Sequence, residues 1–208
     1  MKVIAVNGSP RKDGNTATAL QAMAEELNRE GIETEIVQVG DKLIHGCIGC
    51  AYCRKSENNR CVFNDDIVNE TAEKLRNADG FILGSPTYYA GIAGTMKCFL
   101  DRVFYSSTKY FRGKVAAAVA VTRRAGAVDA SNQLTSYLKL GQTIIPPTQY
   151  WPIVYGMQKG EVLKDEEGMQ TVRKTAKAMA WILKSMKNSA EAFPIPDDEP
   201  KIATNFIR

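Results

Sequence analysis

The sequence lacks the uninterrupted apolar run of roughly 18 to 20 residues that a membrane-spanning helix requires. Its first residues, Met-Lys-Val-Ile-Ala-Val, are followed by polar residues too soon for a secretory signal peptide. Low-complexity tracts and internal repeats are also missing. We therefore expect a cytoplasmic protein with no membrane partner.

Charge of one sign is not concentrated anywhere in the chain. Lysine and arginine number 27 against 23 acidic residues, a net charge of +4, and the excess is spread out. Because nucleic-acid binders usually carry a basic stripe, we expect no nucleic-acid partner, although mild positive charge suits small anions. The 44% apolar and 24% charged content excludes disorder and collagen, and the length of 208 residues predicts one domain.

Two nucleotide-binding motifs are also missing. The chain contains neither the G-x-G-x-x-G fingerprint of dinucleotide sites nor the G-x-x-x-x-G-K-[ST] loop of ATP hydrolysis. These absences argue against a tightly bound dinucleotide and against an ATPase. A mononucleotide stays possible.

Short apolar runs alternate with helical patterns along most of the chain. The runs predict strands at residues 3–6, 32–39, 80–84, 115–121 and 143–145. Apolar stripes with helical spacing predict helices at residues 15–30, 67–78, 95–105, 129–140 and 165–187. Because the strands are typical of strands buried on both faces, helices must cover both sides of a parallel sheet. The sequence therefore predicts a doubly wound, five-stranded parallel α/β fold with three α/β/α layers.

Two segments fall outside this pattern. Residues 40–64 form a long irregular segment that holds four of the five cysteines, and loops of this length in compact domains are usually functional or disordered. Residues 188–208 contain three prolines and predict an extension that packs on a neighbour or frays. We therefore expect a domain over residues 1–187, with a cysteine-rich insert at 40–64, followed by a C-terminal extension.

The loop after the first strand is suited to a phosphate. In a doubly wound sheet, ligands bind beyond the carboxyl ends of the strands where the strand order reverses, next to the loops after strands one, three and four. Residues 8–16 read Gly-Ser-Pro-Arg-Lys-Asp-Gly-Asn-Thr and lead directly into a helix, whose N-terminus attracts anions. Ser9, Arg11, Asn15 and Thr16 are the candidate ligands. The alternative is that this segment only turns the chain and caps the helix.

The loops after strands three and four contain groups that could hold a flat ring. Pro86, Thr87, Tyr88, Tyr89 and Gly91 combine a rigid turn, a hydroxyl, two aromatic rings and a glycine that allows close approach. The alternative is a Ser-Pro turn with two half-buried tyrosines.

The fourth loop offers hydrogen-bond donors and a glycine where the polar edge of such a ring would lie. Thr122, Arg123 and Gly126 are its candidate residues, and its arginines could equally be ordinary surface charges.

The cysteine spacing is a second, independent signal. Cys47, Cys50, Cys53 and Cys61 follow the pattern C-x2-C-x2-C-x7-C. A reducing cytoplasm keeps thiols free of disulfides, and this compact triplet with a fourth thiol suits a [4Fe–4S] cluster better than zinc. Unmetallated thiols and a zinc site stay open as alternatives. Cys98 lies on a predicted helix and is interpreted as a buried apolar residue.

These motifs occur in an order that resembles a known family. Residues 8–16, 65–66, 84–89, 96–97 and 101–102 resemble the NADPH-dependent FMN reductase and iron–sulfur flavoprotein group of flavodoxin-like proteins, over roughly residues 1–187. The resemblance implies FMN, with its phosphate in the first loop and its ring between the third and fourth loops. The cysteine pattern is similar to the compact cluster motif of the iron–sulfur flavoproteins. Residues 96, 97, 101 and 102 are interpreted as structural, with local ion pairing.

The resemblance also implies a function. It predicts a flavin-dependent oxidoreductase that moves electrons from NAD(P)H or a ferredoxin-like donor to small acceptors such as flavins, quinones or oxygen species, and that assembles as a homodimer or homotetramer. Because FMN carries the reactive atoms, no catalytic side chain is predicted. One alternative is a flavodoxin-like electron carrier, although such carriers are usually acidic and this chain has a pI near 8.7. Another is a zinc-stabilised scaffold without flavin.

Overall fold

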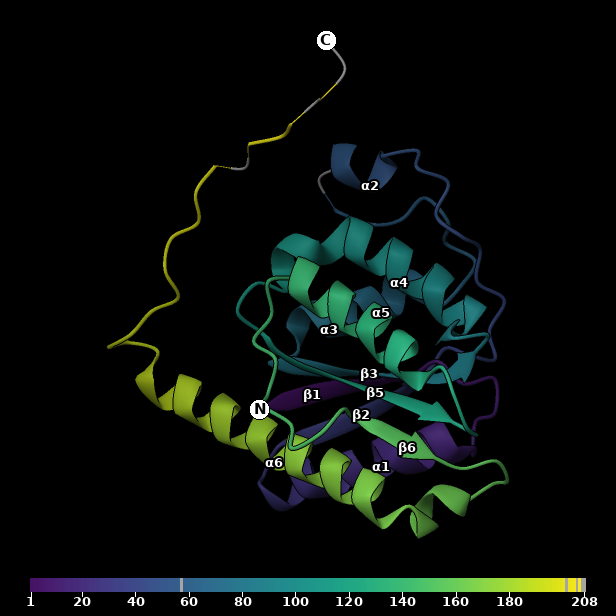
Figure 1. Ribbon diagram of the computed structural model, residues 1–208. Coiled ribbons are helices and arrows are strands. Elements are labelled where there is room, and N and C mark those ends of the chain that lie inside the picture. The colour runs from purple at the N-terminus through teal and green to yellow at the C-terminus, as the bar shows by residue number, and fades with distance from the viewer. Residues whose placement is uncertain (57, 201, 205, 207–208) are drawn as a thin grey trace.

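The sheet has a doubly wound order. The computed structural model describes residues 1–56, 58–200, 202–204 and 206. Its parallel strands follow the order β2-β1-β3-β5-β6, and a short strand, β4, pairs antiparallel with the end of β3 (Figure 1). The strands are β1 (Lys2–Asn7), β2 (Glu33–Gln38), β3 (Gly80–Tyr88), β4 (Gly91–Ile92), β5 (Val115–Thr122) and β6 (Ile153–Tyr155).

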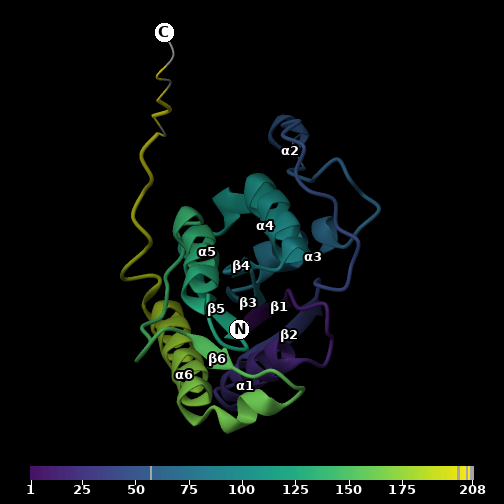
Figure 2. The same ribbon diagram turned by 45° about the vertical axis from the view of Figure 1, so that its right-hand side comes forward.

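Helices cover both faces of the sheet. The α-helices are α1 (Asn15–Arg29), α2 (Tyr52–Lys55), α3 (Val68–Asn77), α4 (Gly94–Ser107), α5 (Ala127–Leu140) and α6 (Glu166–Ser189), with 3-10 turns η1 (Thr108–Tyr110) and η2 (Glu161–Lys164). Helices α1 and α6 lie on one face, and α3, α4 and α5 lie on the other (Figures 1 and 2). The predicted three-layer α/β fold is therefore confirmed.

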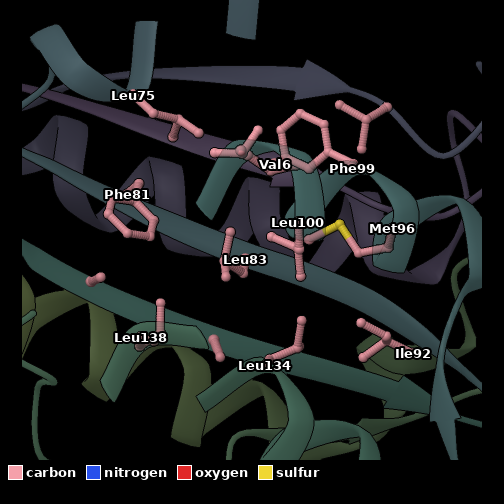
Figure 3. Close-up of a cluster of buried hydrophobic side chains, with 14 of the residues drawn as sticks. Val6, Leu75, Phe81, Leu83, Ile92, Met96, Phe99, Leu100, Leu134 and Leu138 are labelled. Carbon is pink, nitrogen blue, oxygen red and sulfur yellow. The ribbon is translucent and has the colours of Figure 1, made fainter. Parts of the chain in front are cut away.

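Each central strand contributes to two hydrophobic cores. In β1, Ile4 and Val6 face the layer of α3, α4 and α5, whereas Val3 and Ala5 face α1 and α6. In Figure 3, Phe81 and Leu83 of β3 lie among apolar side chains of the covering helices. This two-sided burial explains why the central strands are continuous apolar runs in the sequence.

The fifth strand predicted at residues 143–145 is present only as a parallel bridge. Ile144 forms only a single bridge with Val115, and the chain then leaves the sheet at Pro146 and Pro147. Proline has no N–H to donate to a ladder and restricts the residue before it, so the strand cannot continue. The fifth strand is β6, which pairs in parallel with the end of β5. The loop after β6 consequently lies at the same edge of the sheet as the loop after β5.

The chain after α6 has no regular secondary structure in its described part, and it runs past the end of the domain (Figure 1). Arg112 donates a hydrogen bond to the backbone oxygen of Pro196 at 2.5 Å. The predicted extension over residues 188–208 falls partly outside the described residues, so the division of the chain at residue 187 stays a prediction. No helix in the described ranges is long and apolar enough to cross a membrane.

The loop after β1 is packed tightly from two sides. A Cβ at Gly40, just after β2, would lie 2.3 Å from the backbone oxygens of Gly8 and Ser9, and a Cβ at Gly8 would lie 2.8 Å from the side chain of Met96. The loop therefore fits between β2 and α4 only because positions 8 and 40 are both glycine.

We predict that Gly40→Ala displaces this loop and lowers the free energy of unfolding by about 1–3 kcal/mol, the usual cost of overpacking. Urea denaturation measures the change. Gly94→Ala is the matched control, because nothing lies within 4 Å of a Cβ at Gly94, and its effect should stay within about 0.5 kcal/mol. Equal stability of the two variants would contradict this description of the packing.

Candidate functional site

The loops at the carboxyl edge of the sheet enclose a cavity of about 230 Å³. Its lining residues are Ser9, Arg11, Asn15, Thr16, Pro86, Thr87, Tyr88, Val121, Thr122, Arg123, Gly156 and Met157. The structure thus brings together nine of the twelve residues predicted to bind the cofactor. Tyr89, Gly91 and Gly126 do not line this cavity.

The first loop is rigid. The side chain of Asn7 accepts a hydrogen bond from the Ser9 N–H at 3.0 Å, and Ser9 Oγ accepts one from the Arg11 N–H at 3.1 Å. Gln38 donates to the Ser9 backbone oxygen at 2.7 Å and accepts from the Asn7 amide at 2.6 Å. The edge strand β2 therefore fixes the loop in place before any ligand binds.

The first turn of α1 borders this cavity, and its N-terminus has no side-chain cap. The residue before the helix is Gly14, and no described side chain caps the helix N-terminus. The first N–H groups of a helix have no partners within the helix and carry a partial positive charge. This arrangement favours an anion beside Ser9 and Thr16.

Asn15 makes contacts that the sequence did not predict. Its amide nitrogen donates to the Gln158 backbone oxygen at 2.9 Å, and its amide oxygen accepts from the Gly160 N–H at 2.8 Å. Asn15 therefore joins the start of α1 to the loop after β6. Gly156 and Met157 of that loop line the cavity. Sequence reasoning missed both, although the apolar run at residues 153–155 followed by a glycine was a usable signal.

The third loop is a β-hairpin. Thr87 pairs with Ile92, and Tyr89 and Ala90 at the tip have positive φ angles of 46° and 59°. The ring of Tyr89 is fully exposed, whereas Tyr88 is half-exposed at the cavity. The Thr87 hydroxyl oxygen is buried, and it has no hydrogen-bond partner among the described residues. A buried polar atom without a partner is costly, so a ligand group in the cavity would stabilise it.

The two glycines outside the cavity shape the hairpin. A Cβ at Gly126 would lie 2.8 Å from the Cα of Ala90, and Gly126 has a φ of +85°. A Cβ at Gly91 would lie 3.3 Å from the side-chain amide of Gln133, which accepts a hydrogen bond from the Ile92 N–H at 3.2 Å. Both glycines therefore allow the hairpin to pack against α5, rather than contacting a ligand in this cavity.

The four cysteines of the insert line a second, smaller cavity of about 20 Å³. Cys53 is buried, and its pKa is raised by burial and then by the neighbouring thiols, of which Cys61 has the largest effect. No group of three or more histidine, cysteine or acidic side chains in the described part of the chain is arranged to hold a metal ion. The structure thus places the four thiols around one cavity without a metal-binding geometry. Cys98 does not line this cavity.

A buried arginine organises the cysteine segment. Arg102 of α4 forms an ion pair with Asp66, and its Nε donates to the Sγ of Cys61 at 3.2 Å. It also donates to the backbone oxygens of Phe63 at 3.2 Å and His45 at 3.3 Å. Burial acts to lower the pKa of Arg102, but the hydrogen bonds with Asp66 and Cys61 outweigh burial and raise it.

Of the residues that the sequence assigned to local ion pairing, Lys97 and Asp101 form such a pair at 2.6 Å. Asp101 also accepts a hydrogen bond from Tyr137 of α5. Burial, followed by this hydrogen bond, raises the pKa of Tyr137 to about 12. Tyr137 and Asp101 line a cavity of about 520 Å³ that shares Cys47 and Cys53 with the cysteine cavity.

A family assignment follows from comparison with known proteins. Residues 1–158 match the model of the NADPH-dependent FMN reductase family. This match covers well over half of the chain, so the protein belongs to that family and is a flavin-dependent oxidoreductase. FMN is the cofactor that this membership supports, and a redox donor and acceptor are its partners.

Relatives of similar length agree with this assignment. The chain is 34% identical to an iron-sulfur flavoprotein of Methanocaldococcus jannaschii over 195 residues, which is 90% of this chain and 100% of the relative. It is 32% identical to an iron-sulfur flavoprotein of Archaeoglobus fulgidus, covering 92% of this chain and 100% of the relative. The resemblance inferred from the motifs is therefore confirmed.

Solved structures show the same fold. RosB, crystallised with 8-demethyl-8-formylriboflavin-5'-phosphate, matches with a TM-score of 0.70 at 18% identity, covering 100% of this chain and 94% of RosB. The NADH:FMN oxidoreductase EMOB in its apo form matches with a TM-score of 0.61 at 22% identity, covering 88% of this chain and 89% of EMOB.

We predict that Arg102→Met lowers the free energy of unfolding by about 3–5 kcal/mol, because it leaves the Asp66 carboxylate buried without its partner. Chemical denaturation measures this change. Lys184→Met is the matched control, since Lys184 pairs with Glu30 at an exposed position and should contribute about 0–1 kcal/mol. If both variants lost the same stability, Arg102 would not be the anchor of this segment.

Proposed function

We propose that this protein binds FMN in the cavity at the carboxyl edge of the sheet and uses it to pass electrons from NAD(P)H or a ferredoxin-like donor to small acceptors such as quinones, flavins or oxygen species. The observation that carries the proposal is the buried Thr87 hydroxyl, which has no partner among the described residues and lies in the wall of that cavity. The chemistry of the surrounding groups fits FMN at both ends.

The phosphate end of FMN fits the first loop. Ser9 and Thr16 provide hydroxyls, α1 provides uncapped N–H groups, and Arg11 provides a guanidinium that can form charge-assisted hydrogen bonds. Gln38 and Asn7 hold the loop from behind, so the site is formed before binding. Such preorganisation reduces the entropy that binding costs.

The ring end fits between the hairpin after β3 and the loops after β5 and β6. Pro86 and Tyr88 supply apolar and aromatic contact area on one side, and Thr122 and Met157 lie on the other. Thr87 and Arg123 would donate to the polar edge of the ring. FMN, when bound, supplies the hydride and electron chemistry, and the protein orients the ring and limits its contact with water.

We propose further that Cys47, Cys50, Cys53 and Cys61 hold a [4Fe–4S] cluster that relays single electrons. The support is the donor set, because four thiols and no histidine or acidic side chain line one cavity. The described thiols are not arranged to hold a metal ion in this structure, so the proposal rests on their chemistry and spacing. Ile48 and Phe63 supply apolar walls, Cys47 and Cys50 are exposed, and Arg102 donates to the sulfur of Cys61. Solvent exposure and hydrogen bonds to sulfur are two of the factors that set the potential of such a cluster.

The test of the flavin proposal is NAD(P)H oxidation with a benzoquinone acceptor, measured while FMN or riboflavin is titrated into flavin-free protein. We expect turnover with both flavins. Arg11→Met should raise the half-saturating FMN concentration about tenfold or more, as for a lost charge-assisted hydrogen bond, and leave that of riboflavin unchanged. Arg124→Met is the matched control, because Arg124 does not line the cavity. A protein that binds FMN but turns over with neither NAD(P)H nor a reduced ferredoxin would be a carrier, and one that binds no flavin would contradict the proposal.

For the cluster, we predict that Cys61→Ser removes most of the bound iron and acid-labile sulfide from anaerobically purified protein, because serine does not replace a thiolate ligand. Cys98→Ser should retain the wild-type content, since Cys98 lies outside the cysteine cavity. Zinc instead of iron and sulfide in the wild-type protein would contradict the proposal, and so would a protein that contains no metal.

A further inference from the structure

We propose that Asn15 is a positioning residue: its side-chain amide fixes the loop after β6, residues 156–160, against the start of α1 and so sets the wall of the flavin cavity opposite the hairpin. The effect on flavin binding rests on the proposed function, whereas the hydrogen bonds of Asn15 to the loop do not. It departs from the expectation that Asn15 serves as a phosphate ligand.

Both ends of the Asn15 amide bind the backbone of this one loop. The nitrogen donates to the Gln158 oxygen at 2.9 Å, and the oxygen accepts from the Gly160 N–H at 2.8 Å. A side-chain amide that donates to one backbone oxygen and accepts from one backbone N–H of the same loop fixes both the position and the orientation of that loop. The contact spans more than 140 residues of sequence, so it joins two parts of the site that the sheet alone does not fix.

Gly156 makes room for this contact. A Cβ at Gly156 would lie 2.8 Å from the amide nitrogen of Asn15 and 2.8 Å from the backbone nitrogen of Val162. Any other residue at position 156 would push the amide away from the loop. The glycine and the asparagine therefore form one arrangement built from two distant segments.

The loop after β6 is held by local bonds and by attachments to neighbouring segments. The Glu161 carboxylate accepts from the N–H groups of Met157 at 2.8 Å and Gln158 at 2.7 Å, and these bonds lower the pKa of Glu161. These bonds restrain the loop internally, but they do not fix its position relative to the rest of the domain. Gly156 donates to the Thr122 oxygen at 2.9 Å, which attaches the loop to the end of β5. On the side of α1, Lys159 forms an exposed ion pair with Asp13 at 3.9 Å, and Asn15 provides the hydrogen-bonded attachment.

Met157 connects this geometry to flavin binding. It lines the cavity together with Tyr88 and Thr122, on the segment between the two attachments. If the amide is lost, the loop keeps its bonds to Glu161 and Thr122 but loses its hydrogen bonds to α1, so Met157 can shift in the cavity wall. This change affects the ring end of the ligand, so it should weaken the binding of FMN and riboflavin alike, whereas a phosphate ligand would matter for FMN only.

The experiment measures the dissociation constants of FMN and riboflavin for the full-length, flavin-free protein by fluorescence quenching. We expect Asn15→Ala and Gly156→Ala each to raise both constants by the same factor, roughly fivefold or more, as for two lost hydrogen bonds. Asn28→Ala is the matched control. Asn28 also lies on α1 and accepts a backbone N–H, from Thr34 at 3.1 Å, but it is at the other end of the helix. Its constants should stay within about twofold of the wild type.

A second readout does not need the flavin. Amide hydrogen exchange of the Gly160 N–H in flavin-free protein should be slow in the wild type and faster in both variants. Fast exchange at Gly160 in the wild type would overturn the inference, and so would an Asn15→Ala protein that binds FMN weakly but riboflavin normally. If the wild type binds neither flavin, the proposed function fails, while exchange at Gly160 still decides whether the contact exists.

Discussion

Burial of β1, β3 and β5 on both faces is the constraint on which the rest of the structure depends. Because each of these strands carries apolar side chains on both sides, helices must cover both faces, and the chain must cross from one layer to the other. The crossing lies between β1 and β3, whose neighbouring carboxyl ends lead into the first loop and the hairpin. Polar groups of both loops are thereby concentrated around one cavity.

Helix α4 connects the two candidate sites. It begins at Gly94, directly after Ala93, whose N–H donates to Ser85 beside the hairpin at 3.0 Å. Eight residues later it carries Arg102, at a rise of about 12 Å along the helix axis. Arg102 binds the cysteine segment through Asp66 and Cys61. One helix therefore connects the hairpin beside the first cavity to the cysteine segment.

The sequence predicts the parts that depend on local pattern and misses those that depend on distant partners. The strands at residues 3–6 and 115–121 were predictable because two-sided burial leaves an unbroken apolar run. The fifth strand was not, because residues 143–145 and 153–155 are equally short apolar runs next to prolines, and only pairing with β5 distinguishes them.

The same limit applies to single residues. The sequence places the Asn15 amide beside the first loop, but its partners, Gln158 and Gly160, lie far along the chain. It groups Arg102 with Asp101 as neighbours, whereas the structure pairs Arg102 with Asp66 on another segment.

The most direct measurement is a crystal structure of the protein with FMN. The account predicts density for the phosphate at Ser9 and Thr16 and for the ring beside Thr87, with the Thr87 hydroxyl hydrogen-bonded to it. Flavin density elsewhere, with this cavity filled by side chains, would contradict the account.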